Sequence, residues 1–199
     1  MTLWDSIRQF NEACSVRMRA TPGWVPDAEI ELAMALIDEE RRELADALQA
    51  GDMTETADAI ADGLYVRAGL LLRLGLARTY IGDLLVPSGQ APSWTDLVDR
   101  EVLIAELEDD DRQIRRAILA GNLIEVDTST HRTMYTLSTL AVLLRIPLDA
   151  VFAEVQRSNM AKLVDGRVVR HPQTNKVLKP AGWTPPDVAG VLVDHGFAA

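Results

Sequence analysis

The amino-acid sequence predicts an all-α fold, a helical bundle that ends in a small C-terminal β-hairpin or irregular tail. Apolar residues recur at steps of three and four through most of the chain, whereas strand-like alternation is confined to a short segment after residue 164. The chain has 199 residues, of which 48% are hydrophobic, so it is long enough for one sizeable core. It contains no internal repeat and no low-complexity segment, and we interpret residues 1–199 as a single domain.

The first three helices are expected at residues 2–19, 28–49 and 54–76. In the first, Leu3, Ile7 and Phe10 follow steps of three and four, and the helix is expected to stop before "TPGWVP". Asp27 can cap the second helix and Gly51 can end it. Because the turn "AGDM" is short, the second and third helices should lie antiparallel and side by side, so that acids on the two helices can face each other.

Further helices are expected at residues 96–120, 129–144 and 148–163. The stretch "LLVPSGQAPSW" before them is rich in proline and small residues and is expected to be a connection. In residues 164–199, "RVV" and "KVL" flank a polar turn, which predicts a small hairpin and then a tail. The acidic run "EDDDR", Glu108–Arg112, is expected to be a solvated helix face, because consecutive acids point around a helix and do not converge on a metal ion.

The charge is unevenly distributed. A net charge of −10 argues against a protein that binds duplex nucleic acid with its whole surface. Residues 162–179 nevertheless carry a net charge of +4, which leaves −14 on the remainder. A small cationic element on an acidic protein suits a phosphorylated small molecule better than a polymer, and an ordinary solvated loop is the alternative.

The sequence predicts neither a membrane span nor a disulfide. The longest apolar run, "YVRAGLLLRLGLA", is interrupted by Arg67 and Arg73, which indicates a buried core helix. No leader-like segment opens the chain, and its single cysteine, Cys14, cannot form an intramolecular disulfide. We therefore expect a cytoplasmic protein with no membrane contact.

The acids of the second and third helices form a convergent pattern. Glu55, Asp58 and Asp62 lie at i, i+3 and i+7, within about 60° on one helix face. The second helix supplies Glu39, Glu40 and Glu43. Such oxygen ligands suit Mg²⁺ or Mn²⁺, which bind a few carboxylates and keep positions for water and phosphate oxygens. The alternative is a pair of solvated faces with salt bridges to nearby arginines, namely Arg41, Arg42 or Arg73.

These motifs resemble a known family. The run "EERRE" (Glu39–Glu43) followed by "ETAD" (Glu55–Asp58) looks like the paired ExxE and ExxD motifs of the MazG-like all-α nucleoside triphosphate pyrophosphohydrolase superfamily. "EVQRSNMAKL" (Glu154–Leu163) and "NKVLKPAGWTPPD" (Asn175–Asp187) are similar to the ending of phage and bacterial members, including phosphoribosyl-ATP pyrophosphohydrolase-like proteins. The resemblance covers roughly residues 25–76 and 148–187, and residues 80–128 look like an insertion atypical of the family.

The resemblance implies a metal-dependent hydrolase. Its members split a nucleoside triphosphate into a monophosphate and pyrophosphate, with roughly two or three Mg²⁺ or Mn²⁺ ions between the acids and the phosphates. The residues that it assigns to the metal are Glu39, Glu40, Glu43, Glu55 and Asp58. Glu39 or Glu40 would activate the attacking water, and Asp62 is assigned to a metal, a water or the sugar hydroxyl. We expect no catalytic role for Cys14 or for the histidines, which are His131, His171 and His195.

The remaining candidate residues would bind the substrate. Asn159 and Lys162 share a helix face, so we expect them to meet phosphate or sugar atoms, and Lys176 and Lys179 could close over the pyrophosphate. An amphipathic helix end with solvated lysines is the alternative. Candidates for stacking on the base are Trp24, Trp183 and Tyr65, although a tryptophan more often belongs to a core.

No residue decides the substrate. The phage-like ending favours a purine deoxynucleotide such as dGTP, in a bacterial cytoplasm or that of a phage's bacterial host. The alternatives are dUTP or a broad house-cleaning range, phosphoribosyl-ATP, and a non-catalytic helical adaptor that uses the acids to bind a basic partner. The resemblance also implies a homodimer or homotetramer, because relatives complete their sites with a neighbouring subunit.

Overall fold

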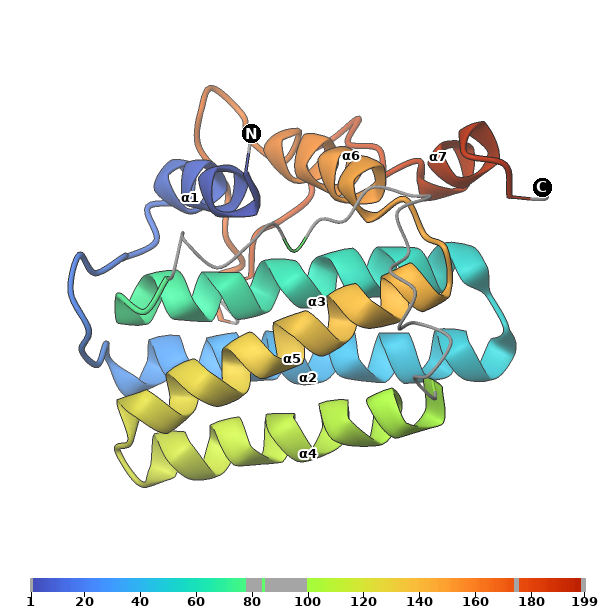
Figure 1. The fold of residues 1–199 in the computed structure, drawn as a ribbon. Coiled ribbons are helices and arrows are strands. Elements are labelled where there is room, and N and C mark those ends of the chain that lie inside the picture. The colour runs from blue at the N-terminus through green and yellow to red at the C-terminus, as the bar shows by residue number, and fades with distance from the viewer. Residues whose placement is uncertain (1, 78–83, 85–99, 174–175, 198–199) are drawn as a thin grey trace.

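The computed structural model describes residues 2–77, 84, 100–173 and 176–197. In these residues the chain forms helices and no named β-strand, which confirms the all-α class (Figure 1). The helices are α1 (Leu3–Ala13), α2 (Asp27–Ala50), α3 (Met53–Leu74), α4 (Arg100–Leu119), α5 (Leu123–Leu143), α6 (Leu148–Met160) and α7 (Val188–Asp194).

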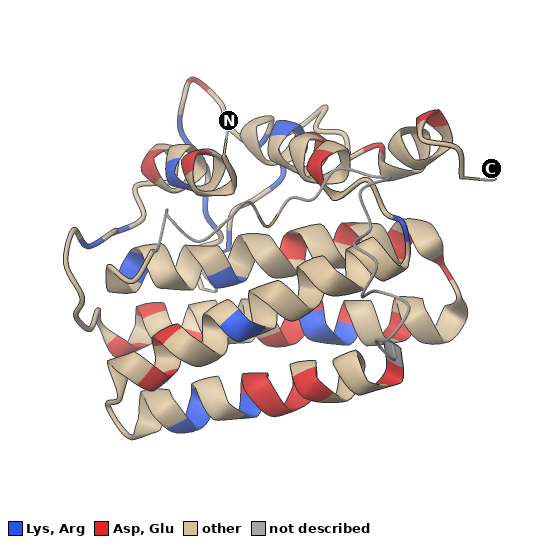
Figure 2. Ribbon diagram, viewed as in Figure 1, with Lys and Arg blue, Asp and Glu red and all other residues tan. Residues whose placement is uncertain are grey.

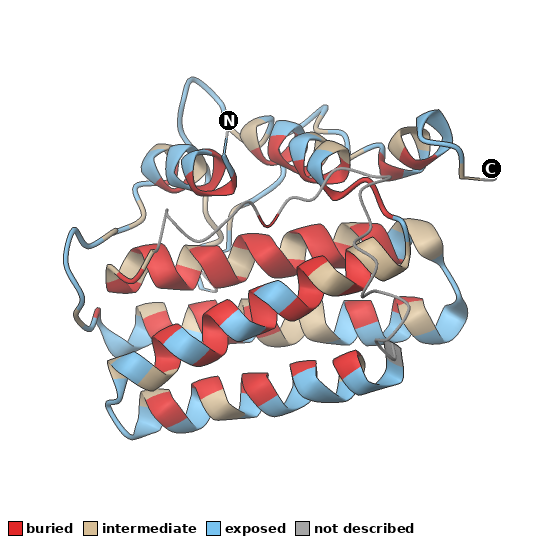
Figure 3. Ribbon diagram, in the orientation of Figure 1, coloured by how far each residue is buried: buried red, intermediate tan, exposed pale blue. Residues whose placement is uncertain are grey.

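Helix α3 is the centre of the molecule. The long helices α2, α3, α4 and α5 lie alongside one another, and the shorter helices α1, α6 and α7 cover the other side of α3 (Figure 1). Buried residues follow nearly the whole length of α3, whereas α2 and α4 are exposed along one side (Figure 3). A helix that is apolar on most of its surface needs neighbours on all sides, and α3 has them.

The predicted pair of antiparallel helices is confirmed to within two residues at each end. Gly51 ends α2 in the left-handed region, with φ of 68°, and the Asp52 side chain accepts a hydrogen bond from the backbone N–H of Glu55 at the start of α3. Both signals are local in the sequence, so the short turn fixes the pairing of α2 with α3. It thereby brings the two acidic faces to the same end of the bundle.

The first helix is shorter than predicted. α1 ends at Ala13, and Ser15 turns the chain with a φ of 54°. The chain then crosses the C-terminal end of α3, where Arg19 and Gly23 donate backbone hydrogen bonds to carbonyls of α3. Gly75 is required there, since a Cβ at this position would lie 2.3 Å from the carbonyl oxygen of Thr21. The residues after Ala13 therefore leave the helix, and their backbone N–H groups pair with the last carbonyls of α3.

Helix α5 begins earlier than predicted, at Leu123, where the Asn122 side chain caps it. The threonine-rich stretch at its start remains helical because its hydroxyls donate to carbonyls one turn earlier, as Thr130 does to Val126 and Thr133 does to Ser129. The helix expected at 148–163 is confirmed over Leu148–Met160. The helix expected at 96–120 is described from Arg100, and the stretch "LLVPSGQAPSW" lies, apart from Leu84, outside the described residues.

The predicted hairpin is reduced to two isolated bridges within the described residues. Val164 pairs with Arg167, and Arg170 pairs with Val177. His171 and Leu178 donate backbone hydrogen bonds across the second pair, at 2.8 Å each. The antiparallel direction was therefore predicted correctly, but the segment is too short to form regular strands. It carries Arg170 and Lys176 back toward α2 and α3.

The prediction of a solvated "EDDDR" face is wrong for two of its acids. Asp110 and Asp111 are buried, and Asp111 accepts two hydrogen bonds from the buried Arg67 of α3, at 2.7 and 2.9 Å. Asp110 pairs in the same way with Arg132 of α5. These acids face the rest of the bundle because α4 packs on α5, a tertiary contact that local spacing does not reveal.

Among the described helices no single one is long and apolar enough to cross a membrane. Only α5 and α6 taken together satisfy the length and composition criteria, and they are bent by 116°.

Candidate functional site

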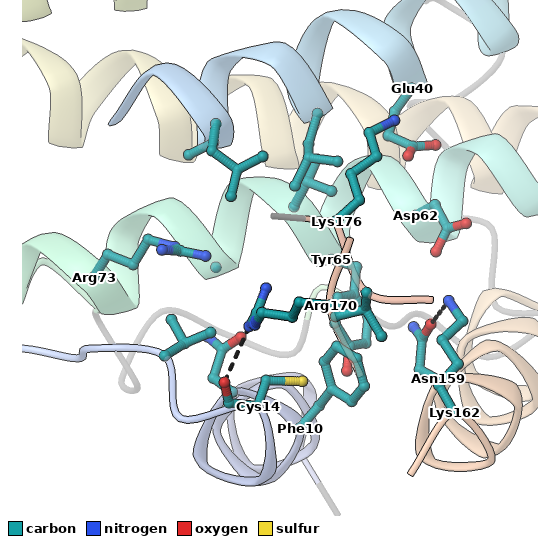
Figure 4. A pocket seen from close by; sticks show the side chains of 18 residues that line it. Phe10, Cys14, Glu40, Asp62, Tyr65, Arg73, Asn159, Lys162, Arg170 and Lys176 are labelled. Atoms are coloured by element: carbon teal, nitrogen blue, oxygen red, sulfur yellow. Dashed lines mark hydrogen bonds between the residues drawn. The ribbon is translucent and has the colours of Figure 1, made fainter. Parts of the chain in front are cut away.

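A pocket of about 230 Å³ opens where the central helix meets the N- and C-terminal parts of the chain (Figure 4). One wall comes from α2 and α3, the opposite wall from α1 and the end of α6, and the segment after α6 passes over it. The floor is apolar, with Leu32, Leu36 and Val66 among its residues, and Phe10 and Tyr65 lie edge to face with ring centroids 5.8 Å apart. Polar groups gather at both ends of this apolar floor, a pattern typical of ligand sites.

Glu40 and Asp62 project into one end of the pocket, from α2 and α3 (Figure 4). Burial raises the pKa of Glu40 to about 9, and the neighbouring carboxylates of Asp62, Glu43, Glu39 and Asp58 add to the rise. The predicted meeting of the two acidic groups across α2 and α3 therefore occurs. At neutral pH the protein keeps Glu40 protonated when no cation is bound.

The same cause acts on the two acids of α3. Burial raises the pKa of Asp62 to about 7, with Asp58 adding to the rise and Lys162 opposing it. Burial also raises the pKa of Asp58 to about 6, with Glu55 and Glu43 adding to it. Each carboxylate is thus surrounded by others of the same sign, and the nearby lysine only partly offsets this repulsion.

The carboxylate oxygens of these acids are suitable ligands for a hard divalent cation, but the side chains do not stand close enough together to surround one. Glu40 Oε2 and Asp58 Oδ1 are buried and have no hydrogen-bond partner. Unpaired carboxylate oxygens of this kind are the ligands that Mg²⁺ and Mn²⁺ prefer. In the part of the chain that the structure describes, however, no three acidic, histidine or cysteine side chains stand close enough together to form a metal site. The metal-ligand set therefore stays a prediction.

Of the five predicted metal ligands, only Glu40 lines the pocket, while Glu39 and Asp58 lie outside its lining. Glu43 and Glu55 also lie outside it and are exposed. They lie beside it, since both raise the pKa of Asp58. The alternative of salt bridges to Arg41, Arg42 or Arg73 is not realised for these acids among the described residues. The ion pair that does form joins Glu39 to Lys176, with Nζ and Oε2 2.5 Å apart.

The predicted basic residues lie on the opposite wall. Lys162 donates to the side-chain oxygen of Asn159 at 2.6 Å, and both residues line the pocket (Figure 4). Burial lowers the pKa of Lys162, and the charge of Asp62 opposes this shift. Lys179 lies over the ring of Trp183, 4.3 Å from its centroid, just outside the pocket. Cations from the C-terminal part of the chain thus face the acids of α2 and α3.

Of the three aromatic candidates, only Tyr65 lines the pocket, and its hydroxyl donates to Gln156 at 2.8 Å. Trp183 donates its indole N–H to the carbonyl oxygen of Ser158, which fastens the tail to α6. Trp24 is 37% exposed and lies outside the pocket lining. The structure therefore favours structural roles for both tryptophans.

Sequence reasoning missed the other end of the pocket. Arg73 and Arg170 line it together with Cys14, and Arg170 donates to the carbonyl oxygen of Cys14 at 3.0 Å (Figure 4). From the sequence, Arg73 was interpreted as an interruption of an apolar helix and as a possible salt-bridge partner of the nearby acids, and Arg170 only as part of a basic segment. The signal that could have found Arg73 is its position on the same face as Asp62, eleven residues further along the helix.

Comparisons with known proteins agree with this geometry. Residues 7–82 match the family model described as Phosphoribosyl-ATP pyrophosphohydrolase, which confirms the resemblance to the MazG-like superfamily for that segment. The matched residues include α2, α3 and part of α1, and so all the acids of the site. The similarity inferred for residues 148–187 lies outside the match.

The chain is also 30% identical over 151 residues to "Uncharacterized protein L479" of Acanthamoeba polyphaga mimivirus. This alignment covers 67% of the chain and 59% of the viral protein, so the chain spans less than two thirds of its relative's length. No solved structure matches the chain significantly.

Proposed function

We propose that this protein is a pyrophosphohydrolase that cleaves a nucleotide between its α and β phosphates and depends on a divalent metal ion. The observation that carries the proposal is that Glu40 and Asp62, buried among other carboxylates of α2 and α3, face Lys162 and Asn159 across one pocket. A triphosphate is the ligand that needs both a cation-binding acidic wall and a basic wall. The family match over residues 7–82 supports hydrolysis of a phosphoanhydride.

The metal would be held by carboxylates, with Glu40 and Asp58 contributing the buried oxygens that lack partners and Glu39, Glu43 and Glu55 completing the set. When bound, divalent ions supply the positive charge that offsets the acids and lowers the pKa of a coordinated water. Before Glu39 can take part, its ion pair with Lys176 must open. Lys176 would then be free to contact the leaving phosphates.

The reaction itself needs few protein groups. The oxygen of a water molecule forms a bond to the α-phosphorus, and the bond from that phosphorus to the bridging oxygen breaks, so that pyrophosphate leaves. The proton of the water passes to Glu40 or Glu39. Burial and the neighbouring carboxylates raise the pKa of Glu40, which suits that residue to a general base. Lys162 and Lys176, which line the pocket, and the nearby Lys179 would offset the charge of the departing pyrophosphate.

Two substrate classes fit this chemistry. A purine deoxynucleoside triphosphate such as dGTP is favoured by the phage-like ending of the sequence. Phosphoribosyl-ATP is favoured by the family model and is an equal candidate. A panel of dNTPs, NTPs and phosphoribosyl-ATP with Mg²⁺ or Mn²⁺, with products resolved by anion-exchange chromatography, separates the two classes. Monophosphate-type product and pyrophosphate are expected, whereas inorganic phosphate or no product at all would contradict the proposal.

The variant Glu43→Ala tests the assignment of the acids. We expect turnover to fall by about 100-fold or more, because a ligand to the metal is lost, while circular dichroism remains that of the wild type since Glu43 is exposed. Glu31→Ala is the matched control, since Glu31 is an exposed acid on the same helix and lies outside the pocket lining. Wild-type turnover in Glu43→Ala would remove this residue from the site.

We also propose that the protein forms a homodimer or homotetramer. The turn between α4 and α5 exposes two large apolar residues, Leu119 at 89% and Ile124 at 78%. Exposed apolar groups at such positions are typical of surfaces that bury against a partner. Light scattering coupled to size-exclusion chromatography should give at least twice the chain mass of 21.9 kDa, and a single-chain mass would contradict this.

A further inference from the structure

A second chamber, of about 400 Å³, adjoins the pocket at the end away from the acids. The two cavities share Cys14, Arg73 and Arg170 in their walls, so they lie side by side. The walls belonging to the second chamber alone include Arg17 and Glu29. The function proposed above makes no use of this space.

The charged groups of the second chamber are mostly basic. The guanidinium groups of Arg17, Arg73 and Arg170 face a single carboxylate, that of Glu29. Glu29 lies 3.8 Å from Arg17 and 3.7 Å from Arg73, distances too long for hydrogen bonds. One carboxylate cannot balance three guanidinium charges, so an excess of positive charge remains in the chamber.

Arg73 carries the strongest sign of a missing partner. Its side chain is only 13% exposed, and its guanidinium makes no hydrogen bond within the part of the chain that the structure describes. Burial lowers its pKa, Glu29 opposes this, and the nearby charge of Arg170 lowers it further. A buried guanidinium offers five N–H donors in a planar fork, which matches the oxygens of a phosphate. An anion at this point would satisfy donors that the protein leaves unused.

Two acids and two arginines thus lie at opposite ends of the pocket. Glu40 and Asp62 lie at one end, whereas Arg73 and Arg170 lie at the other, with Phe10 and Tyr65 near the middle (Figure 4). The same separation is visible along α3, whose acids lie in its N-terminal half and whose arginines lie in its C-terminal half (Figure 2). A plain nucleoside triphosphate would place its uncharged base at the arginine end, which leaves the positive charge there without a bound anion.

We propose that the arginine chamber binds a phosphate group separate from the triphosphate held at the acidic end. This inference rests on the proposed function for the orientation of the nucleotide. The phosphate can come from two sources with the same chemistry. It is either attached to the substrate beyond its base, or it is a free phosphate that occupies the chamber while the nucleotide fills the rest of the cavity.

Calorimetric titration of the chelator-treated protein with inorganic phosphate tests the chamber without any turnover. We expect Arg73→Gln to weaken phosphate binding by about 10-fold or more, because a buried charged donor is lost. Arg73→Lys should retain part of the affinity, since it keeps the charge but loses the fork. Arg116→Gln, which changes an exposed residue of α4 outside the lining of both cavities, should bind phosphate as the wild type does.

Steady-state kinetics then identify the source of the phosphate. If the substrate carries it, Arg73→Gln raises the KM for phosphoribosyl-ATP by about 10-fold and leaves the KM for ATP unchanged. If the phosphate is free, inorganic phosphate binds the wild type, and Arg73→Gln has the same KM as the wild type for both nucleotides. The proposal is overturned if Arg73→Gln matches the wild type both in phosphate titration and in KM.

The two proposals can fail separately. If the protein hydrolyses none of the nucleotides, the proposed function is wrong. The phosphate titration would still show whether the arginine chamber binds phosphate. If Arg73→Gln does not fold, as judged by its thermal transition, Arg17→Gln replaces it, because the Arg17 side chain is 61% exposed and carries no core packing. A 3-fold or greater loss of phosphate affinity in that variant supports the proposal, and unchanged affinity contradicts it.

Discussion

Two groups of buried charges lie on α3, and they differ in how they are satisfied. The charge of Arg67 is paired, because its Nη2 donates to both carboxylate oxygens of Asp111 of α4, and its Nη1 donates to the carbonyl oxygen of Gly63. Asp58 and Asp62, one to three turns earlier, face other carboxylates. The first group is neutral within the chain and serves the fold. The second is not, and its missing counter-charge points to a ligand.

This difference separates structural charges from functional ones more clearly than burial does. Burial raises the pKa values of both Asp111 and Glu40. Next after burial, Arg67 lowers the pKa of Asp111, whereas the carboxylates around Glu40 raise its pKa further. A buried acid with a hydrogen-bonded partner is therefore explained by the fold. A buried acid among acids is explained only by something that the chain does not contain.

The largest effect is expected from breaking the structural pair. Asp111→Ala should lower the free energy of unfolding by about 3 to 5 kcal/mol, because it leaves the buried guanidinium of Arg67 without its partner. Urea denaturation followed by circular dichroism measures the change. The double variant Arg67→Met with Asp111→Leu should recover most of the loss, since apolar side chains of similar volume replace a buried ion pair at little cost. If the single and double variants lose the same free energy of unfolding, Asp111 does more for stability than pair with Arg67.

A substitution among the acids of α2 and α3 should raise the stability of the metal-free protein instead of lowering it. Between about pH 4.5 and pH 9 the folded, metal-free protein holds a proton on Glu40 that the unfolded chain has released. The free energy of unfolding therefore falls as the pH rises through this window. Glu40→Gln removes that dependence and should stabilise the metal-free protein by about 1 to 3 kcal/mol at pH 9, with a smaller gain at pH 5.

Thermal melts in the presence of a chelator at pH 5 and pH 9 measure this gain, and Glu31→Gln is the control from an exposed position on the same helix. The same variant should lose hydrolysis, so that stability and activity change in opposite directions. If Glu40→Gln is less stable than the wild type at pH 9, the carboxylate has a partner within the fold and the comparison between the two groups fails.

A smaller effect is expected on the basic wall. Lys162→Met keeps the aliphatic part of the side chain and removes the charge that faces Asp62. We expect the KM for the nucleotide to rise by about 10-fold with a smaller change in kcat, because a phosphate contact made in both ground and transition states is lost. Initial rates over a range of substrate concentrations measure both constants. An unchanged KM would make Lys162 a structural partner of Asn159 alone.

The smallest effect is expected at an exposed ion pair. Arg112 contacts Asp109 at 2.7 Å on the outer face of α4, where solvent screens the attraction. Arg112→Ala should leave both the thermal transition and the hydrolysis rate at wild-type values. A clear loss of stability would show that the solvent-facing part of the acidic run also belongs to the structural group.

Features that are encoded locally were predicted from the sequence. The start of α3, the end of α2 and their antiparallel pairing depend on Asp52, Gly51 and a short turn, all of which are visible within a few residues. The convergence of Glu40 with Asp62 follows from that pairing and from helical spacing. The burial of Asp111 and the position of Arg170 depend on contacts over 44 and 156 residues of sequence, respectively. No local pattern predicts such contacts, and so the structural pair and the arginine chamber were both missed.

We expect the unpaired acids of α2 and α3 to bind a divalent cation. Calorimetric titration of the chelator-treated protein with Mn²⁺ at pH 7, repeated in two buffers of different ionisation enthalpy, tests it most directly. We expect saturable binding with release of protons, because Glu40 is protonated in the metal-free protein. Glu40→Gln should lose this binding, whereas Glu31→Gln should keep it. Absence of Mn²⁺ binding, or binding that is the same in Glu40→Gln and releases no protons, would contradict it.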